Sequence, residues 1–166
     1  MSDQPTAPAP EPIAARTLKL ERILDGTPDK AFKAWTTPEL LKQFFAPKPY
    51  TTPYAELDVR AGGTNIITMR SPEGQDIPNA GIYLEVVPNR KLVFTDAFDG
   101  AGWQPKSGEP FMVATLTFED APGGKTKYTA QVQHWSVATT KQHEEMGFHP
   151  GWGQCADQLN DLIKTL

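Results

Sequence analysis

The sequence reads PGWGQCADQLNDLIKTL over residues 150–166. Its apolar residues recur mostly at intervals of three and four positions, which places them on one stripe of an α-helix, opposite the polar residues. The apolar stripe comprises Trp152, Cys155, Ala156, Leu159, Leu162, Ile163 and Leu166. A helix of this kind must bury its stripe against a large apolar surface. We expect Trp152 to anchor it, with Gly151 and Gly153 leaving room for close backbone approach.

The start of this helix is predicted from Pro150. Proline inside a helix removes a hydrogen bond and clashes with the preceding turn, so it is tolerated only in a first turn. We therefore expect a short helix after Thr140, a break at residues 147–150, and a long helix from about Pro150 with His149 close to the capping position.

The surface that receives the helix is predicted to be a β-sheet, because apolar and polar residues alternate between residues 54 and 135. Strands are expected at 54–60, 64–70, 80–87, 91–97, 111–119 and 125–135. Short turns such as Gly62-Gly63 separate most of them, and a Gly- and Pro-rich loop spans 99–110. Sequential strands with such short connections should pair antiparallel.

The N-terminal region divides into a tail and the first elements of a domain. Residues 1–15, MSDQPTAPAPEPIAA, are predicted to be a disordered tail, because closely spaced prolines and little apolar surface oppose folding. A strand is expected at 16–24. Two short helices should follow, opened by Thr27-Pro28-Asp29 and Thr37-Pro38-Glu39, in which threonine can cap and proline suits the first turn. The prediction is one domain over residues 16–166.

Composition excludes several classes of protein. The 166 residues carry a formal net charge of −4, which argues against a nucleic-acid partner or an anionic membrane surface. No apolar run is long enough to insert into a membrane. The start of the sequence lacks the basic and apolar regions of a secretory signal, and the one cysteine, Cys155, has no partner for an internal disulfide. A cytoplasmic location is therefore expected.

Several local sequence motifs are similar to those of a known superfamily. The stretches concerned are PDKAFKAWTTPELLKQFF at 28–45, Gly62-Gly63, GIYLEVVPNRKLVFT at 81–95, ATLTFED at 114–120, and Gly151-Trp152. In this order they resemble the START-like (SRPBCC) superfamily, and within it the family named after the activator of the heat-shock chaperone ATPase, in its bacterial single-domain type. The resemblance covers about residues 16–166.

The resemblance implies an α+β helix-grip fold. In this fold a curved antiparallel sheet wraps around a long C-terminal helix, two short helices follow the first strand, and a cavity lies between sheet and helix. Members of the superfamily include binding proteins, cyclases, hydroxylase components and co-chaperone domains. The chaperone activators carry a separate N-terminal chaperone-binding domain that has no counterpart in this sequence, so chaperone activation is not the expected function.

Three polar residues fall on the predicted inner face of the sheet, where a packed core would avoid them. Asn65 shares the phase of Ile67 and Met69, and Asp96 that of Leu92 and Phe94, while His134 alternates with Tyr128, Ala130 and Val132. Tyr83 and Glu85 should share a face that the pattern leaves open. Buried polar groups need partners, so these residues predict water, mutual hydrogen bonds or a ligand.

Other reactive residues have simpler interpretations. His143 and His149, six positions apart, do not match a metal motif and are expected on the surface. Cys155 lies on the buried stripe with no basic neighbour, so it should be a small apolar residue rather than a nucleophile. Trp103 sits in the Gly- and Pro-rich loop, where it could be either a lid over a cavity mouth or a plug over the sheet edge.

These features lead to three functional hypotheses. The first is a binding protein for a small apolar, lipid-like or aromatic molecule, monomeric or weakly dimeric, with no cofactor and no metal. Its expected ligand-binding residues are Asn65, Ile67, Met69, Tyr83, Phe94, Asp96, Trp103, His134, Trp152, Cys155 and Leu159. The second is a cyclase, dehydratase or hydrolase with Asp96, His134 or Tyr83 as acid or base. The third is an interaction module that stimulates a chaperone ATPase, with the chaperone as its partner.

Overall fold

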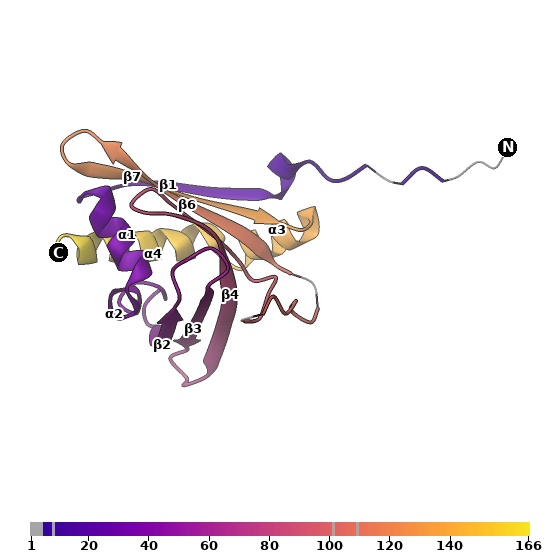
Figure 1. The fold of residues 1–166 in the computed structure, drawn as a ribbon, viewed down its shortest axis with the longest axis horizontal. Helices are drawn as coiled ribbons and strands as arrows, with labels where there is room; N and C mark the ends of the chain where they lie inside the picture. Colours follow the sequence, from indigo (N-terminus) through magenta and orange to yellow (C-terminus); the bar gives the residue numbers. More distant parts are fainter. Residues whose placement is uncertain (1–4, 8, 101, 109) are drawn as a thin grey trace.

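The computed structural model describes residues 5–7, 9–100, 102–108 and 110–166. Within these residues seven strands form one sheet (Figure 1). The strands are β1 (Thr17–Leu24), β2 (Thr51–Leu57), β3 (Thr64–Arg70), β4 (Asp76–Val87), β5 (Lys91–Thr95), β6 (Met112–Ala121) and β7 (Lys125–His134). The helices are the 3-10 turn η1 (Ile13–Arg16) and α1 (Pro28–Thr36), α2 (Pro38–Leu41), α3 (Val137–Glu145) and α4 (Phe148–Ile163). None of these helices is long and apolar enough to cross a membrane.

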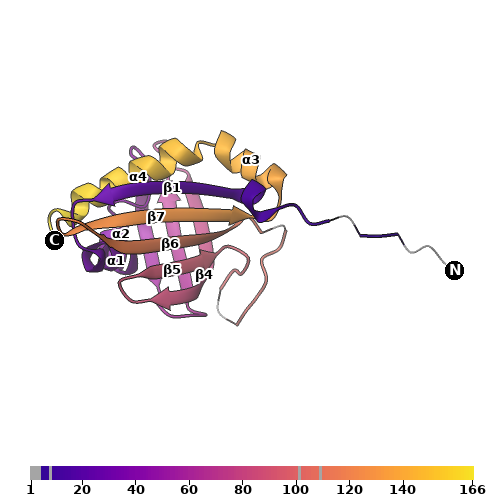
Figure 2. The same ribbon diagram turned by 90° about the horizontal axis from the view of Figure 1, so that it is seen from above.

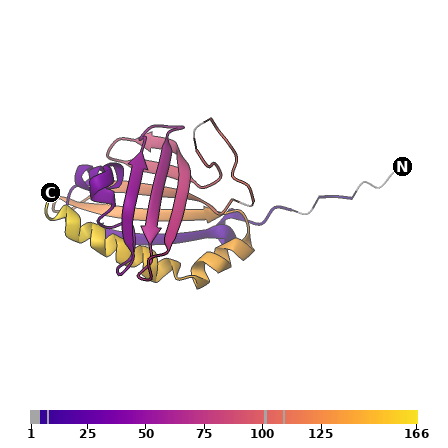
Figure 3. The same cartoon turned by 90° about the horizontal axis from the view of Figure 1, so that it is seen from below.

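The sheet has the order β1-β7-β6-β5-β4-β3-β2, and each neighbouring pair is antiparallel. β1 and β2 follow each other in sequence, apart from α1 and α2, yet lie at opposite edges. The sheet curves so strongly that β2, β3 and β4 cross over β1, β6 and β7, and α4 runs beside the sheet (Figure 3). The predicted α+β helix-grip architecture is confirmed.

Proline explains where the strand predictions missed. β4 begins at Asp76, four residues before its predicted start, and continues through Pro78. β5 pairs with β4 only from Ile82 onward, so the first half of β4 is an edge, where a residue without an N–H is tolerated. β2 likewise starts at Thr51, includes Pro53, and has a register shift between Thr51 and Tyr54 at the outer edge of the sheet.

The first two helices begin at the predicted Thr-Pro signals, although they differ from the prediction in capping and in length. α1 has Pro28 in its first turn and Thr27 at its N-cap, but Thr27 makes no side-chain cap to the backbone. Instead, a hydrogen bond from the Thr27 side chain lowers the pKa of Asp29. α2 is a single turn that ends at Leu41, shorter than expected.

The predicted tail is only partly described. Residues 1–4 and 8 lie outside the described residues. The other residues before η1 lead away from the sheet in each view (Figures 1 and 2). η1 already begins at Ile13, and Glu11 accepts a hydrogen bond from the Arg16 side chain through its carbonyl oxygen, at 3.0 Å.

The predicted break before the long helix is confirmed, although its residues differ. Gly147 separates α3 from α4 and has φ of 95°, a left-handed conformation that glycine adopts at little cost. The N-cap of α4 is therefore Gly147 rather than His149, and Pro150 is in the first turn. α3 begins at Val137, before the expected Thr140, because Ser136 and Thr139 form a reciprocal capping box.

The buried stripe of α4 is shifted toward its N-terminus. Phe148, Ala156, Leu159 and Ile163 are buried, while Trp152, Cys155 and Leu162 are half-buried. Phe148, not Trp152, is the buried aromatic anchor, because the helix starts two residues earlier than predicted. The two glycines also differ from expectation. Gly151 has no close neighbour, and Gly153 faces the Arg22 side chain rather than a backbone.

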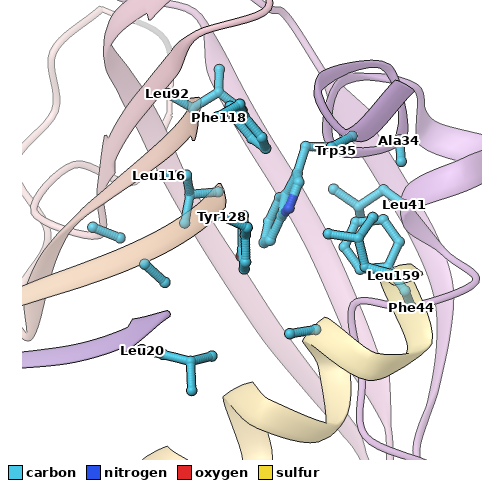
Figure 4. Packing of buried hydrophobic residues seen from close by; sticks show 14 of the residues in the cluster. Leu20, Ala34, Trp35, Leu41, Phe44, Leu92, Leu116, Phe118, Tyr128 and Leu159 are labelled. Carbon is cyan, nitrogen blue, oxygen red and sulfur yellow. The ribbon is translucent and has the colours of Figure 1, made fainter. Parts of the chain in front are cut away.

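The core lies between the inner face of the sheet and the helices (Figure 4). Trp35 of α1 points into its centre, with the Phe44 ring 5.1 Å away at 75°. The core also includes Leu20, Leu41, Leu92, Leu116, Phe118, Tyr128 and Leu159. In β7 every second residue from Thr126 to His134 is buried, which confirms the predicted phase of that strand.

Candidate functional site

A cavity of about 480 Å³ lies between the sheet and α4. β3, β4 and β5 supply most of its sheet side, and the α1–α2 region and the α3–α4 junction contribute at opposite ends of α4 (Figure 1). Gln158 of α4 ties one of these ends together. Its side chain donates to the carbonyl oxygens of Phe44 and Ala46 and accepts from the Lys48 N–H, at 3.2, 2.9 and 3.1 Å. The wall next to α4 is thus fixed by hydrogen bonds as well as by packing.

Nine of the residues expected to bind a ligand are on the cavity wall. They are Asn65, Ile67, Met69, Tyr83, Phe94, Asp96, Trp152, Cys155 and Leu159. β3, β4, β5 and α4 supply eight of them, and Asp96 directly follows β5. This placement requires that the predicted phases of β3 and β5 and the helical stripe be largely correct. Two of the expected residues, Trp103 and His134, are not among the described residues that line this cavity.

Trp103 packs outside the cavity. It is 59% exposed and has φ of 57°. Its ring stands perpendicular to that of Phe98 at 5.6 Å and covers the turn at Gly62, where an added Cβ would be 3.2 Å from the indole. Trp103 therefore does not line this cavity, because the loop bends back onto its own Phe98.

Tyr83 and Glu85, which were predicted to share one face of the sheet, are separated by an irregularity. The register between β4 and β5 shifts between these two residues, so Tyr83 is buried and Glu85 is exposed. Glu85 forms a 3.1 Å ion pair with Lys91 on the outer face. A bulge reverses the side of the sheet on which later residues point, and strict alternation cannot anticipate it.

Asp96 is on the wall, but its carboxylate is occupied by the backbone. Oδ1 accepts from the N–H groups of Phe111 and Met112, both at 3.0 Å, and Oδ2 accepts from Phe111 at 3.2 Å. These bonds close the loop of residues 97–110 at its base. Asp96 therefore anchors the loop. Its carboxylate oxygens are already hydrogen-bonded, so they are not free to accept a proton from a substrate.

Asn65 is the least satisfied polar group of the site. It is 9% exposed, and its Nδ2 is buried without a hydrogen-bond partner among the described residues. Leaving a buried donor unpaired costs about 1–3 kcal/mol. Gly81 on the neighbouring strand packs close to the Asn65 Oδ1, where an added Cβ would be 3.3 Å away.

Burial further favours the neutral form of two other ionisable groups on the wall. Burial, with a smaller contribution from Asp58, raises the pKa of Tyr83. Burial also raises the pKa of Cys155 to about 12, and its thiol donates to the Phe45 carbonyl oxygen at 3.3 Å. The interpretation of Cys155 as a small apolar residue agrees with this environment, since the thiolate is the nucleophilic form.

The two histidines expected to behave alike do not. His149 is exposed, whereas His143 is half-buried on the cavity wall and its Nδ1 lies 2.8 Å from Nε2 of His134. The surface prediction for His143 is thus wrong. His134 is buried, as its strand phase predicted, but it stands behind His143 instead of lining the cavity. Burial lowers the pKa of both imidazoles, and His134 further lowers that of His143, to about 4.

Several wall residues were not anticipated as site residues. They include Leu41, Phe44, Phe45, Phe111, His143, Met146 and Phe148. Phe44, Phe45 and Phe148 carried a signal, because apolar residues next to predicted helices are candidates for any internal wall. His143 carried none, since its neighbours in sequence are polar and only the fold brings it to His134. Within the described residues no three His, Cys, Asp or Glu side chains cluster as a metal site would require.

Comparisons with known proteins place this geometry in context. Residues 25–164 match the family described as activator of Hsp90 ATPase homolog 1-like protein. A crystal structure of a protein from Nitrosomonas europaea is 38% identical, covers 92% of this chain and 96% of its own, and superposes with a TM-score of 0.86. A solution structure of an AHSA1-like protein from Aeromonas hydrophila shares 16% identity over 90% of this chain and 92% of its own, with a TM-score of 0.68. None of the curated proteins matches this chain.

Proposed function

We propose that this chain, which belongs to the family of activator of Hsp90 ATPase homolog 1-like proteins, binds a small, mostly apolar molecule between α4 and the sheet. The observation that carries the proposal is the combination of a cavity of about 480 Å³ with the unpaired amide of Asn65 on its wall. Small-molecule sites typically span roughly 300–1,000 Å³ and combine apolar walls with a few polar groups.

The character of the wall supports an apolar ligand with few polar groups. Aromatic and aliphatic side chains dominate it, including Trp35, Phe94 and Leu159. An acceptor on the ligand that reached the Asn65 amide would remove the cost of its unpaired donor. A fully packed core of this size would gain more by placing an apolar residue at this position.

The same wall gives little support to acid–base catalysis by the residues expected to carry it. The Asp96 carboxylate is held by backbone N–H groups, and the phenol of Tyr83 has a raised pKa. His134 is buried behind His143. A general acid or base must reach the substrate and exchange a proton near the working pH. Binding therefore accounts for these residues better than turnover does.

The setting we propose is cytoplasmic, with the protein acting as a monomer or weak homodimer. The single cysteine, Cys155, is a free thiol inside the protein, which suits a reducing compartment. Native mass spectrometry of freshly purified protein tests the proposed ligand binding and the proposed oligomeric state. It should reveal a retained small molecule, and it reports the oligomeric state in the same spectrum.

Filling the cavity provides the matched test. Leu159→Trp should abolish uptake of an apolar fluorescent probe such as 1,8-anilinonaphthalene sulfonate. Leu159 is fully buried, so this substitution could also strain the core. Met69→Trp is the milder variant, because Met69 is a half-buried wall residue on β3. Thr68→Trp, one residue away on the opposite face, is its control.

We expect wild type and Thr68→Trp to take up the probe and Met69→Trp to lose at least tenfold in affinity while keeping a cooperative unfolding transition. Equal probe affinity in Met69→Trp and Thr68→Trp would contradict binding in this cavity.

A further inference from the structure

The pair of histidines at the α3 end of the cavity has a defined proton arrangement. His134 is the last residue of β7, and His143 lies in α3, which is otherwise almost wholly polar. Their rings are 5.1 Å apart at 74°, and His134 Nε2 is 2.8 Å from His143 Nδ1. On its other side, His134 Nδ1 lies 3.1 Å from the carbonyl oxygen of Arg16.

The carbonyl oxygen determines which nitrogens carry hydrogen. A carbonyl only accepts, so His134 Nδ1 must be the N–H that donates to Arg16. In the neutral ring His134 Nε2 is then an acceptor, and His143 Nδ1 must be the donor in the 2.8 Å contact. His143 is consequently left with a lone pair on Nε2. One hydrogen bond to a carbonyl oxygen and one between the two imidazoles thus fix the tautomer of the ring that reaches the cavity.

Burial keeps both rings in the neutral form that this chain of bonds requires. It lowers the pKa of His134, against smaller opposing effects of the Arg16 carbonyl and Asp96. For His143, burial and the neighbouring His134 bring the pKa to about 4. Near neutral pH both rings are therefore neutral imidazoles, and the pair does not share an additional proton between an imidazolium and an imidazole.

The free nitrogen of His143 lies in aromatic surroundings. His143 lines the cavity, and its Nε2 has no hydrogen-bond partner among the described residues. The rings of Phe111, Phe148 and Trp152 have their centres 4.9, 5.1 and 6.4 Å from the His143 ring. An acceptor surrounded by aromatic rings suits a donor carried by a flat aromatic molecule, because ring contacts and the hydrogen bond can form together.

We propose that His143 Nε2 is the polar end of the cavity and accepts a hydrogen bond from the hydroxyl group of a phenol-type aromatic ligand. This assignment rests on the proposed binding function and names the class of its ligand. His134 is a positioning residue, because it acts only through His143, by holding the tautomer and the ring orientation. The Arg16 carbonyl in turn orients His134.

The tautomers can be tested without any ligand. Long-range ¹H–¹⁵N correlation spectra of the histidine rings at pH 7 should show hydrogen on Nδ1 and none on Nε2, for both His134 and His143. His149, which is exposed, is the internal reference. A hydrogen on Nε2 of His143 would overturn the assignment, because that nitrogen could then no longer accept.

The ligand class is tested with two probes of similar shape, 2-naphthol and 2-methoxynaphthalene, of which only the first has a hydroxyl donor. We expect 2-naphthol to bind wild type about five- to tenfold more tightly, the usual value of one hydrogen bond. His143→Asn should bind both probes alike. Its amide can still donate to His134 from the position of Nδ1, so the fold is retained, but it has no atom at the position of Nε2.

Two further variants complete the experiment. His143→Gln places a carbonyl oxygen near the position of Nε2 and should restore part of the preference for 2-naphthol. His149→Asn should behave as wild type. A preference that persists unchanged in His143→Asn would overturn the assignment.

The two proposals fail in different ways. If both probes bind wild type equally well, the cavity binds apolar molecules and the role of His143 is wrong. If neither probe binds, the cavity does not bind aromatic molecules of this size, and the proposal of a phenol-type ligand is overturned.

Discussion

At the scale of single residues, the site is shaped by a few polar side chains held inside an apolar wall. Asn65 keeps an unpaired amide, Asp96 holds the backbone of the neighbouring loop, and His143 is oriented by His134. Each of them occupies a position where an apolar residue would pack without a desolvation cost. Such residues are expected to trade stability for binding.

Replacing Asn65 should expose that trade directly. Asn65→Leu preserves the approximate shape while removing the buried unpaired donor, so the free energy of unfolding should rise by about 1 kcal/mol. The affinity for a ligand that bonds to the amide should fall. Urea denaturation measures the first effect, and probe titration measures the second. A loss of stability above about 1 kcal/mol would show that the amide has a partner in the folded protein.

The histidine pair should make stability depend on pH. Above about pH 6.5 His143 is neutral in both folded and unfolded chains and contributes no pH dependence. Between about 6.5 and its folded pKa of about 4, the unfolded chain takes up a proton that the folded chain does not, so stability falls as the pH falls. Partial exposure of the ring limits the loss to roughly 1–2 kcal/mol.

The measurement compares unfolding free energies at pH 7 and pH 4.5 for wild type, His143→Asn and His149→Asn. Other groups also titrate in this range, including His134 beside His143, so the difference between variants is the relevant quantity. Stability of His143→Asn should fall less than that of wild type. Parallel curves for these two proteins would contradict the buried, neutral state of His143.

At the scale of elements, the junction between α3 and α4 determines where the long helix begins. Gly147 ends the first helix and starts the second, and Met146 beside it is 70% exposed while also lining the cavity. The junction therefore lies where the cavity meets solvent. A change in its backbone should alter both the fold and access to the cavity.

Gly147→Ala tests the junction. At a φ of 95° a side chain is strained, so the variant should lose about 1–2 kcal/mol of stability. Gly151→Ala is the matched control, because a Cβ there meets nothing within 4 Å and its φ is not in the left-handed region. Thermal unfolding should separate the two variants. Equal stability would mean that the junction relaxes to an unstrained helix–helix connection.

The anchor of α4 is tested by a pair of truncations. Phe148 is 1% exposed and Trp152 is half-buried, so Phe148→Ala should cost about 3–5 kcal/mol and Trp152→Ala clearly less. Urea denaturation of both variants gives the comparison. The reverse order would indicate that the helix is rotated so that Trp152 faces the core.

At the scale of the whole molecule, the cavity is a consequence of sheet curvature. β1 pairs with β7 while β2 lies at the far edge, so the sheet bends around α4 and its two halves cross (Figure 3). A long amphipathic helix alone cannot fill the concave space that results. Residues far apart in sequence, such as Trp35, Asn65 and His143, consequently share one wall.

Local sequence patterns were sufficient for the order of the elements and for nine residues of the wall, while the helix-grip architecture was implied by the resemblance to a known superfamily. Alternation placed Asn65, Ile67 and His134 on the inner face, and the helical period placed Leu159, because side-chain direction follows backbone periodicity. The position of Gly147 before Pro150 predicted the break in the helical region. These features depend only on residues close together in the chain.

Tertiary structure alone decided the rest. The bulge between Tyr83 and Glu85 arises from pairing with β5, and Trp103 settles on Phe98 and the turn at Gly62. His143, which sequence analysis placed on the surface, is oriented by His134 on another element. Each of these depends on a partner that only the fold brings near. Local periodicity determines the face on which a side chain points, whereas its partner there depends on how distant segments pack.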